Sequence, residues 1–454
     1  MKYSIVTFGC RVNQADSLRL EEDLRAHGLV EAPSLEADLV LVNTCSVTAS
    51  ADQAARQTIR RIARENPNAR IVATGCYATR CTDEVAALPA VVRVVRNDQK
   101  HALVLGLVNS VMPATALRTS EASEPRERSG AGVPASERVG EFEGRSPSME
   151  NDGPCGATIE PGVAGRTAFT LRVQTGCEER CAYCIIPTTR GASRSVPVTD
   201  VVREVERVAA AGFKEIALTG VHLGSYGRDL SPSATLLDLL RALDAVNGDV
   251  TFRISSLEPM DCTPAIVRLV ASSGRFLPHF HLPLQHASDR VLAAMRRPYT
   301  LDDYRRLVDG IVAPLPHASI GSDMIVGFPG ETDQDFAQNV EYLPSSPLTH
   351  LHVFPYSDRP GTDASTMRDK VHGSVVRDRG AQLREIGARL TARFRASQVG
   401  AVRPGLTLED GTLVVTDNYL KVRIDPGLAR NTRVFIEIPP VGATFRSRVV
   451  QPIA

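Results

Sequence analysis

The chain has 454 residues, of which 43% are hydrophobic and 23% charged, an ordinary composition for a soluble globular protein. Its length predicts about two to four domains with ample core. The formal net charge of zero excludes a whole-molecule field that would attract nucleic acid or anionic membrane, so any RNA partner must meet a local basic patch.

We expect no targeting signal at the N-terminus, because the short strand-like run at residues 3–8 leads directly into Gly9 and Cys10. No apolar run approaches the roughly 20 residues needed to span a bilayer. We therefore expect a cytoplasmic protein without a membrane partner. Its nine cysteines, an odd number, favour metal or redox use over disulfides in that compartment.

Strands and helices alternate over the first hundred residues, which predicts an open parallel α/β domain at residues 1–110. Strands are expected at residues 3–8, 38–42, 70–73 and 91–95, and helices at residues 16–27 and from Ser50 to just before Pro67.

Three cysteines of this region, Cys10, Cys45 and Cys76, each follow a predicted strand. The carboxyl ends of parallel strands meet at one edge of a sheet, where open α/β sheets bind ligands, so we expect these thiols to converge into a three-cysteine site. The alternative is that they are three small buried hydrophobic side chains. Cys81 lies just beyond and is not expected to be a ligand.

Hydrophobic periodicity is lost in the middle of the chain. Residues 118–153 are rich in Ser, Glu, Gly, Pro and Arg, so they cannot bury enough apolar surface to offset the entropy of ordering. We predict a disordered linker at residues 111–165, in which Cys155 is incidental.

A second cysteine group, Cys177, Cys181 and Cys184, forms a C-x3-C-x2-C motif directly after the apolar run at residues 169–173. Three thiolates so close together can bind an iron–sulfur cube and leave its fourth iron open for chemistry, whereas structural clusters normally have four cysteines. Zinc would need a fourth Cys or His nearby, and none follows at normal spacing. Buried structural thiols are the remaining alternative.

Six further strands alternate with helices, which predicts a partial, open (β/α)6 barrel at residues 166–398 rather than a closed eight-fold barrel. The strands are expected at residues 170–174, 215–219, 251–255, 279–285, 319–326 and 350–356.

Polar side chains share faces of these strands, because successive side chains point to opposite faces. They are Arg253, Ser255, His279, His281, Gln285, Asp323, His350 and His352. This pattern indicates a lumen that holds a large polar ligand. A single histidine at such a position, however, more often makes its hydrogen bonds within the barrel and binds no ligand. We do not expect His279 and His281 to be a metal pair. Glycine-rich turns at residues 219–224 and 327–332 permit close backbone approach to a ligand.

The tail combines an arginine-rich helix, predicted at residues 371–395, with short strands at residues 406–409, 412–416, 419–424 and 433–438. A charged helix of this kind usually exposes its arginines to solvent, although the arginines can also contact the phosphates of an RNA. The strands predict a small β-barrel at residues 399–454.

These motifs match a known family. The motif at Cys177, Cys181 and Cys184 resembles the radical S-adenosylmethionine (SAM) enzymes, and strand-end Cys10, Cys45 and Cys76 resemble their methylthiotransferase subfamily. Residues 218–227 and 350–357 are similar to the threonylcarbamoyladenosine (t6A) tRNA methylthiotransferases. Residues 283–289 are also similar to the ribosomal-protein methylthiotransferase.

The resemblance implies two [4Fe–4S] clusters and SAM as cofactors. The cluster on Cys177, Cys181 and Cys184 would cleave SAM to a 5′-deoxyadenosyl radical, and the cluster on Cys10, Cys45 and Cys76 would supply sulfur. Further SAM contacts are expected from Thr219, Gly220, Arg253, Ser255, Gly327 and Glu331. It also implies a TRAM-like RNA-binding domain at the C-terminus and a low-potential electron donor such as flavodoxin or ferredoxin. No acid–base residue is assigned, because the cofactor supplies the difficult chemistry.

The leading hypothesis is a radical SAM methylthiotransferase that modifies t6A at position 37 in the anticodon loop of tRNA. A sibling alternative keeps the chemistry but acts on isopentenyladenosine-37 of tRNA or on a ribosomal-protein aspartate. An alternative of another class is a metal-dependent RNA-binding module without catalysis. The sequence assigns no role to Cys81, Cys155 or Cys262.

Overall fold

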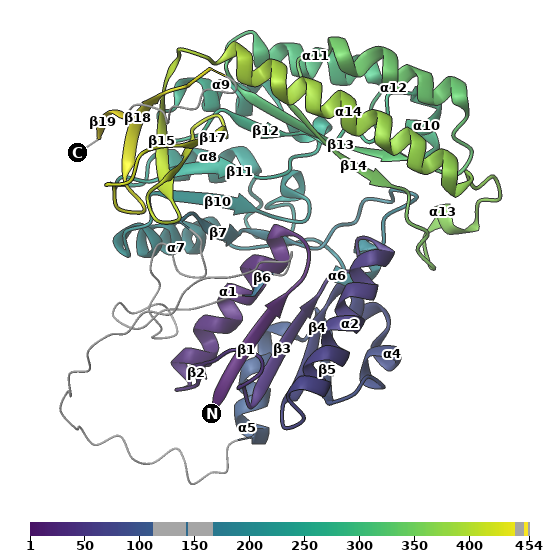
Figure 1. Ribbon diagram of the computed structural model, residues 1–454, viewed down its shortest axis with the longest axis vertical. Helices are drawn as coiled ribbons and strands as arrows, with labels where there is room; N and C mark the ends of the chain where they lie inside the picture. The colour runs from purple at the N-terminus through teal and green to yellow at the C-terminus, as the bar shows by residue number, and fades with distance from the viewer. Residues whose placement is uncertain (112–141, 144–166, 441–448, 453–454) are drawn as a thin grey trace. The chain divides into compact units, whose positions relative to one another are not determined.

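The computed structural model describes residues 1–111, 142–143, 167–440 and 449–452, which form two compact units (Figure 1). Of the described residues, the first unit contains 1–46, 50–111 and 142–143, and the second contains 47–49 and those from 167 onward. The predicted linker at residues 111–165 and Cys155 lie almost entirely outside the described residues. The finer division at residues 110, 166 and 399 stays a prediction.

The first unit is built on a parallel sheet with the strand order β2-β1-β3-β4-β5, and the short β6 pairs antiparallel with β1. Its strands are β1 (Lys2–Thr7), β2 (Val30–Glu31), β3 (Leu39–Thr44), β4 (Arg70–Gly75), β5 (Val91–Val95) and β6 (Phe142–Glu143). Its helices are α1 (Arg11–Ala26), α2 (Ala49–Glu65), α3 (Cys76–Arg80), α4 (Thr82–Ala86) and α5 (Leu103–Val111). The predicted open α/β domain is confirmed.

Helices cover both faces of this sheet (Figure 1). On one face, α1 and α5 bury leucines such as Leu20, Leu24 and Leu103 against the strands. On the other face, α2, α3 and α4 bury Ile59, Tyr77 and other apolar side chains. All six residues of the central strand β3 are buried, as expected for a strand covered from both sides.

Helix α1 begins five residues earlier than predicted, at Arg11 instead of Asp16. Its first turn is held by a tertiary contact, because the Asn13 side-chain amide donates to the carbonyls of Phe8 and Thr44 at 2.8 and 2.9 Å. This contact joins residues far apart in sequence, so local pattern did not reveal it. As a result, Cys10 is the N-cap residue of α1 rather than part of a loop.

The second unit contains six parallel strands in the order β7-β10-β11 and β12-β13-β14. A parallel bridge between Ser256 and His281 joins the two halves, which gives the predicted open six-stranded barrel. The strands are β7 (Phe169–Arg172), β10 (Glu215–Thr219), β11 (Thr251–Ile254), β12 (His279–His281), β13 (Ser319–Val326) and β14 (His350–Pro355). Strands β8 (Gln174–Thr175) and β9 (Arg194–Ser195) form a separate small hairpin.

Strand β12 is shorter than predicted, ending at His281 instead of Gln285. Pro283 follows, and proline has no N–H to donate to a neighbouring strand. Pairing resumes only at Gln285, which forms an isolated bridge with Met324 of β13.

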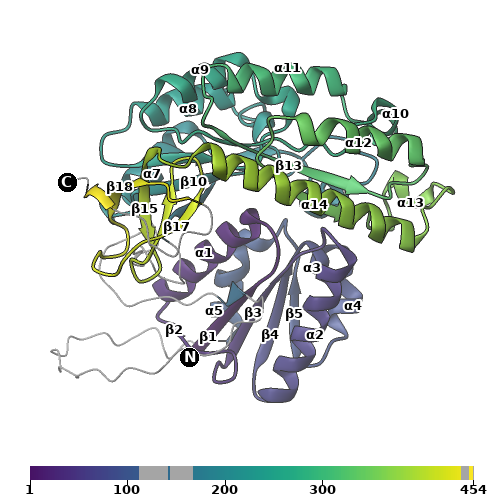
Figure 2. The ribbon, with the colours of Figure 1, turned by 45° about the horizontal axis from the view of Figure 1, so that its top comes forward.

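Helices form the outer layer of the barrel, most visibly α8, α9 and α11 (Figure 2). They are α6 (Ile186–Arg190), α7 (Val198–Ala210), α8 (Leu236–Asp244), α9 (Pro264–Ser272), α10 (Asp289–Ala294), α11 (Leu301–Val312), α12 (Asp333–Ser345), α13 (Asp363–Thr366) and α14 (Gly373–Ser397). Helices α8, α11 and α12 each begin with a capping box, in which Thr235, Thr300 and Thr332 exchange hydrogen bonds with an aspartate three residues on.

Two arginines of the long helix α14 have structural partners. Arg379 is 6% exposed and pairs with Glu331 and Asp333 at 2.9 and 2.6 Å. Arg393 donates to the carbonyl of Pro344 at 2.6 Å. The helix therefore packs along the barrel through part of its charged face, and these two side chains do not form an open basic surface.

The C-terminal residues form an antiparallel sheet with the order β17-β16-β15-β18-β19. Its strands are β15 (Val402–Leu408), β16 (Leu413–Thr416), β17 (Lys421–Arg423), β18 (Arg433–Glu437) and β19 (Val449–Pro452). The first four correspond to predicted strands, whereas β19 was not predicted. Among the described residues, no helix combines the length and the apolar character required to cross a bilayer.

Arg253 of β11 connects the barrel to this sheet, although the sequence analysis expected it to contact SAM. Its guanidinium pairs with Glu215 at 3.1 Å, donates to the carbonyls of Thr416 and Asp417, and lies 4.8 Å from the ring centre of Tyr419. The side chain is 1% exposed. A cofactor contact of Arg253 stays a prediction, and its observed contacts are structural.

We predict that Arg253→Ala loosens the C-terminal sheet, because it leaves the buried Glu215 carboxylate without a counter-charge. Removing one partner of a buried pair costs about 3 kcal/mol or more. Hydrogen exchange should accelerate over residues 402–437. Arg203→Ala, which removes an exposed pair with Asp200, is the control and should change stability by less than about 0.5 kcal/mol. Wild-type protection in Arg253→Ala would contradict the role of this residue.

Candidate functional site: two cysteine groups at strand ends

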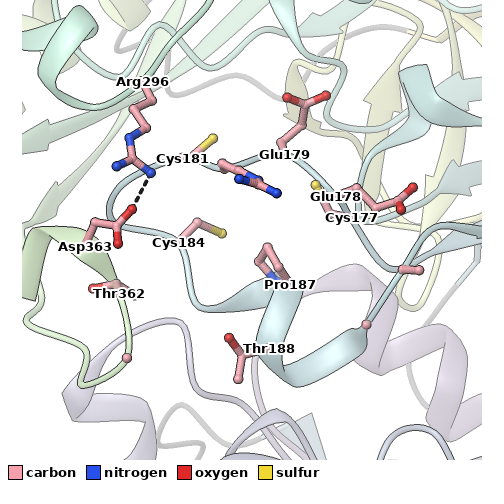
Figure 3. A pocket seen from close by; sticks show the side chains of 14 residues that line it. Cys177, Glu178, Glu179, Cys181, Cys184, Pro187, Thr188, Arg296, Thr362 and Asp363 are labelled. Atoms are coloured by element: carbon pink, nitrogen blue, oxygen red, sulfur yellow. Dashed lines mark hydrogen bonds and ion pairs between the residues drawn. The ribbon is translucent and has the colours of Figure 1, made fainter.

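Cys177, Cys181 and Cys184 line one cavity of about 540 Å³ at the end of the β7–β8 segment, and their sulfur atoms point into it (Figure 3). The other lining residues are Glu178, Glu179, Arg180, Pro187, Thr188, Gly191, Ala192, Arg296, Gly361, Thr362 and Asp363. Arg296 and Asp363 form an ion pair at the rim. The structure therefore brings the three predicted ligands of this motif together.

The backbone holds this loop from two sides. The N–H of Cys177 donates to Gly191 at 3.0 Å, and the N–H of Ala182 donates to Met295 at 3.0 Å. Gly176 has a φ of +79°, and a Cβ at that position would lie 1.9 Å from the carbonyl oxygen of Ala192. Only glycine fits the turn that precedes the first cysteine.

Arg297 donates from Nη1 to the Cys181 sulfur at 3.1 Å. Its side chain is 2% exposed, and it also pairs with Glu258 and donates from Nε to Tyr299 at 3.0 Å. A buried guanidinium beside a sulfur atom stabilises negative charge on that sulfur. The sequence showed no sign of this contact, because Arg297 lies far along the chain from the cysteine motif.

His222 approaches the first cysteine of the motif, with Nδ1 3.8 Å from the Cys177 sulfur and Nε2 2.8 Å from an Asp261 oxygen. Burial opposes protonation of His222, but hydrogen bonds to Asp261 and Cys177 outweigh it and raise its pKa to about 10. Positive charge is therefore favoured beside the Cys177 sulfur, at His222, and beside the Cys181 sulfur, at Arg297.

Burial raises the pKa of Cys184 to about 12 and also raises that of Cys181. Without a metal these thiols keep their protons at neutral pH, whereas a coordinating thiol loses its proton. Three clustered sulfurs, a donor aimed at one of them and an open cavity in front fit an iron–sulfur cluster with one exposed iron.

Gln174 connects the cysteine loop to the glycine-rich turn after β10. Its amide donates to the carbonyl of Gly176 at 2.7 Å and accepts from the N–H of His222 at 2.9 Å. A Cβ on Gly220 would lie 3.0 Å from the Gln174 amide oxygen and 2.7 Å from Leu223. The predicted SAM contacts Thr219 and Gly220 therefore lie next to the support of the cysteine loop.

Ser255 follows β11, and its N–H donates to Leu218 of β10 at 3.1 Å. Its hydroxyl is buried and has no hydrogen-bond partner among the described residues. An unpaired buried hydroxyl beside the end of β10 fits a site that a polar ligand completes. The predicted contact of Ser255 with SAM is compatible with this position and stays a prediction.

Glu331 organises the loop after β13. Its carboxylate accepts from the backbone N–H groups of Gly327 and Phe328 and pairs with Arg379. Gly327 has a φ of +77°, and a Cβ there would lie 2.4 Å from Val376. Glu331 thus shapes a loop in which Gly327 must be glycine, and their predicted contacts with SAM are not tested by this geometry.

Cys10, Cys45 and Cys76 follow the carboxyl ends of the adjacent strands β1, β3 and β4. Cys10 is exposed, whereas Cys45 and Cys76 are buried. A Cβ on Gly9 would lie 2.4 Å from the Cys45 sulfur, and Asn97 donates to the Cys76 sulfur at 3.7 Å. The three cysteines thus follow adjacent strand ends, and their convergence into one three-cysteine site stays a prediction.

A buried polar network supports this edge. Lys100 donates to Asp16 at 2.9 Å and to Asn43 at 3.0 Å, and Asn43 donates to the backbone carbonyl of Asn13 at 2.8 Å. The network fixes the ends of β1 and β3 against α1, and so fixes Cys10 and Cys45. Two further cysteines are placed elsewhere: Cys81 lies between α3 and α4, and Cys262 is buried in the barrel core.

Two family models match the chain in tandem. Residues 2–96 match the Uncharacterized protein family UPF0004, and residues 171–343 match the Radical SAM superfamily. The methyltransferase TsrM from Kitasatospora setae, solved with cobalamin and a [4Fe–4S] cluster, has a TM-score of 0.52 at 16% identity, covering 77% of this chain and 71% of its own. The fold and the cysteine cavity therefore define a radical SAM enzyme.

Relatives that align along most of the chain narrow the class of radical SAM enzyme further. The Aquifex aeolicus (strain VF5) protein named "Threonylcarbamoyladenosine tRNA methylthiotransferase MtaB" is 35% identical over 93% of this chain and 96% of its own length. A Streptomyces avermitilis "tRNA-2-methylthio-N(6)-dimethylallyladenosine synthase" is 31% identical, covering 88% and 74%. A Salinispora tropica "Ribosomal protein uS12 methylthiotransferase RimO" is 33% identical, covering 88% and 82%.

The chain belongs to the radical SAM methylthiotransferase family, whose members are transferases that use SAM and [4Fe–4S] clusters. The predicted enzyme class and cofactors are confirmed. The three relatives carry different substrates in their names at similar identity, so the family alone leaves the substrate open.

We predict that Gly9→Ala lowers the iron bound by the first unit, because the new methyl group would displace the Cys45 sulfur. Gly28→Ala is a matched control, since Gly28 also has a positive φ, +76°, but has no atom within 4 Å of an added Cβ. After reconstitution, Gly9→Ala should bind about half the iron of the wild type and Gly28→Ala the full amount. Equal iron in the two variants would contradict a cluster beside Gly9.

Proposed function

We propose that this enzyme converts N6-threonylcarbamoyladenosine at position 37 of tRNA to its 2-methylthio derivative. The observation that carries this substrate is the similarity to the protein named for it, 35% identical along 93% of this chain. Three further relatives with the same name are 31–34% identical along more than 90% of the chain. Polar side chains inside the barrel also suit a substrate that carries charged and hydroxyl groups.

Six cysteines hold the two clusters in this proposal. Cys177, Cys181 and Cys184 hold the cluster that supplies the electron for reductive cleavage of SAM, which is supported by their shared cavity and by the Arg297 donor. Cys10, Cys45 and Cys76 hold the second cluster, which is supported by their position on adjacent strand ends. The chain's own residues position these thiols, and Arg297 and His222 place positive charge beside Cys181 and Cys177.

SAM lies against the ends of β10 and β11 in this proposal, where Thr219, Gly220 and the unpaired Ser255 hydroxyl gather. Gly327 and Glu331 shape the loop after β13 from the same end of the barrel. Arg253 is the predicted contact that this geometry favours least, since carbonyls and Glu215 already occupy its guanidinium.

The C-terminal sheet is proposed to contact tRNA in the cytoplasm. Lys421 and Arg423 of β17 are exposed, which supports a phosphate contact, although the sheet as a whole has no large basic excess. A low-potential donor such as flavodoxin or ferredoxin is proposed as the source of electrons.

We predict that Cys181→Ala abolishes SAM cleavage and keeps about half of the bound iron, because the first unit retains its own cluster. Cys81→Ala is the matched control and should keep the full iron content and activity. The measurements are iron and sulfide analysis and release of 5′-deoxyadenosine under reducing, anaerobic conditions. Stoichiometric zinc in place of iron at either site would overturn the enzymatic proposal.

Nucleoside analysis tests the substrate. Deleting the gene should remove 2-methylthio-t6A from total tRNA and restore it on complementation, as measured by mass spectrometry. Loss of 2-methylthio-isopentenyladenosine, or of a methylthiolated ribosomal-protein aspartate, would assign the sibling substrate instead. Persistence of 2-methylthio-t6A in a strain that has no second enzyme would show that the proposed substrate is wrong.

A further inference from the structure

Arg297 is a buried arginine outside the cysteine motif whose guanidinium group contacts the cysteine loop. It lies shortly after the end of α10, and its side chain is 2% exposed. Its Nη1 donates to the Cys181 sulfur at 3.1 Å. The two residues are 116 positions apart in the sequence, so the fold alone brings them together.

The other two nitrogens of this guanidinium group also have partners. Nη2 donates to a carboxylate oxygen of Glu258, and Nε donates to the hydroxyl of Tyr299 at 3.0 Å. That hydroxyl in turn donates to the carbonyl of Pro283 at 2.8 Å, so the backbone after β12 supports it. Three partners fix the plane of the guanidinium group, because its N–H groups have fixed directions. Nη1 is therefore held against the sulfur.

A donor at a sulfur ligand affects the charge that an iron–sulfur cluster can carry. One-electron reduction of a [4Fe–4S] cluster adds one negative charge, which the cluster shares with its cysteine sulfurs. A buried positive donor stabilises that added charge more than an exposed donor would, since little water screens it. Hydrogen bonds to the sulfurs and the local charge therefore help to set the reduction potential of such a cluster.

We propose that Arg297 raises the reduction potential of the cluster held by Cys177, Cys181 and Cys184, so that a low-potential one-electron donor can reduce it. Arg297 is a positioning residue, because it acts through the Cys181 sulfur. In the reduction one electron passes from the donor to the cluster, and no covalent bond forms or breaks. This inference rests on the proposed function, which assigns the three ligands, and goes beyond it by giving a role to a residue that is not a ligand.

Glu258 is expected to act in the opposite direction. Its carboxylate pairs with the same guanidinium group and is 25% exposed, so it offsets part of the positive charge beside Cys181. Removing the negative charge of Glu258 should therefore favour the reduced cluster, whereas removing the positive charge of Arg297 should disfavour it. A general loss of structure would not produce two changes of opposite sign.

The competing interpretation is that Arg297 binds the carboxylate of SAM, since arginine pairs readily with carboxylates. Two observations favour a role at the sulfur. Each nitrogen of the guanidinium group already has a partner, and the side chain is 2% exposed. A bidentate contact with SAM would compete with Glu258 and the Cys181 sulfur for the same two terminal nitrogens.

The test isolates this cluster in a full-length parent chain that carries Cys10→Ala, Cys45→Ala and Cys76→Ala. The parent chain is reconstituted anaerobically with iron and sulfide, and it should bind about four iron atoms. The ratio of reduced to oxidised cluster is then measured by EPR at fixed ambient potentials. Dithionite and viologen mediators set these potentials, and SAM is left out.

Arg297→Gln should lower this ratio about tenfold at a fixed potential, a shift of about 59 mV for a one-electron couple, because a charged donor becomes neutral. Arg297→Lys keeps the positive charge but loses the planar fork, so it should recover part of the loss. Glu258→Gln should raise the ratio about threefold, because the charge that it removes is partly screened by solvent.

Arg296→Asn is the matched control. Arg296 lines the same cavity and pairs with Asp363, but its side chain is 52% exposed and, among the described residues, it donates to no sulfur. Asparagine suits the positive φ of 59° at this position. Loss of this exposed charge should change the ratio by less than about twofold.

The outcomes separate this inference from the proposed function. If the parent chain binds its cluster and both Arg297 variants keep its ratio of reduced to oxidised cluster, this inference is wrong and the proposed ligands stand. An unchanged ratio with weaker equilibrium binding of SAM would likewise overturn it, because Arg297 would then be a SAM contact. If the parent chain binds no four-iron cluster, the proposed ligands fail and this inference fails with them.

The test does not depend on Arg297→Gln alone. If that variant loses its cluster, Arg297→Lys and Glu258→Gln decide the question by the signs of their shifts. A lower ratio in Arg297→Lys together with a higher ratio in Glu258→Gln supports the role of Arg297. Shifts of the same sign, or no shift in either variant, contradict it.

Discussion

Parallel pairing of the strands is the constraint on which both cysteine groups depend. In the first unit it brings the ends of β1, β3 and β4 to one sheet edge, and with them Cys10, Cys45 and Cys76. In the second unit it gathers the loops after β7, β10 and β14 at one end of the barrel. Residues distant in sequence become neighbours because every strand in such a sheet ends on the same side.

Buried charges then hold these loops in one conformation. Glu331 accepts two backbone N–H groups and pairs with Arg379, so the loop after β13 is tied to α14. Arg297 shares its donors among Glu258, Tyr299 and the Cys181 sulfur. Since a buried charge is costly unless several partners satisfy it, such groups contribute to positioning more than to net stability.

Glycine has a related role at both sites. Gly9 and Gly176 have positive φ angles, and at each a Cβ would collide with an atom of the site or its supporting turn. Backbone therefore approaches the Cys45 sulfur and the Ala192 carbonyl more closely than any other residue would permit. In the polar lumen, by contrast, hydrogen bonds between strands hold His281, Asp323 and His352.

Short-range patterns in the sequence were enough to predict much of this protein's structure. The spacing of Cys177, Cys181 and Cys184 and the alternation of strands and helices are short-range signals, and the structure confirms the fold class and the gathering of this motif. Pattern failed where a distant contact or a single proline decided the outcome, as at the start of α1 and at Pro283 after β12.

What the sequence alone determined is therefore the kind of chemistry: two groups of three thiols, each placed after a strand of a parallel sheet. What only the tertiary structure decided is the surroundings of those thiols and of the lumen. Arg297 beside Cys181, Asp261 behind His222 and Asp323 between two histidines join residues far apart in the chain. Such pairings follow from strand register and side-chain packing, and no sequence spacing encodes them.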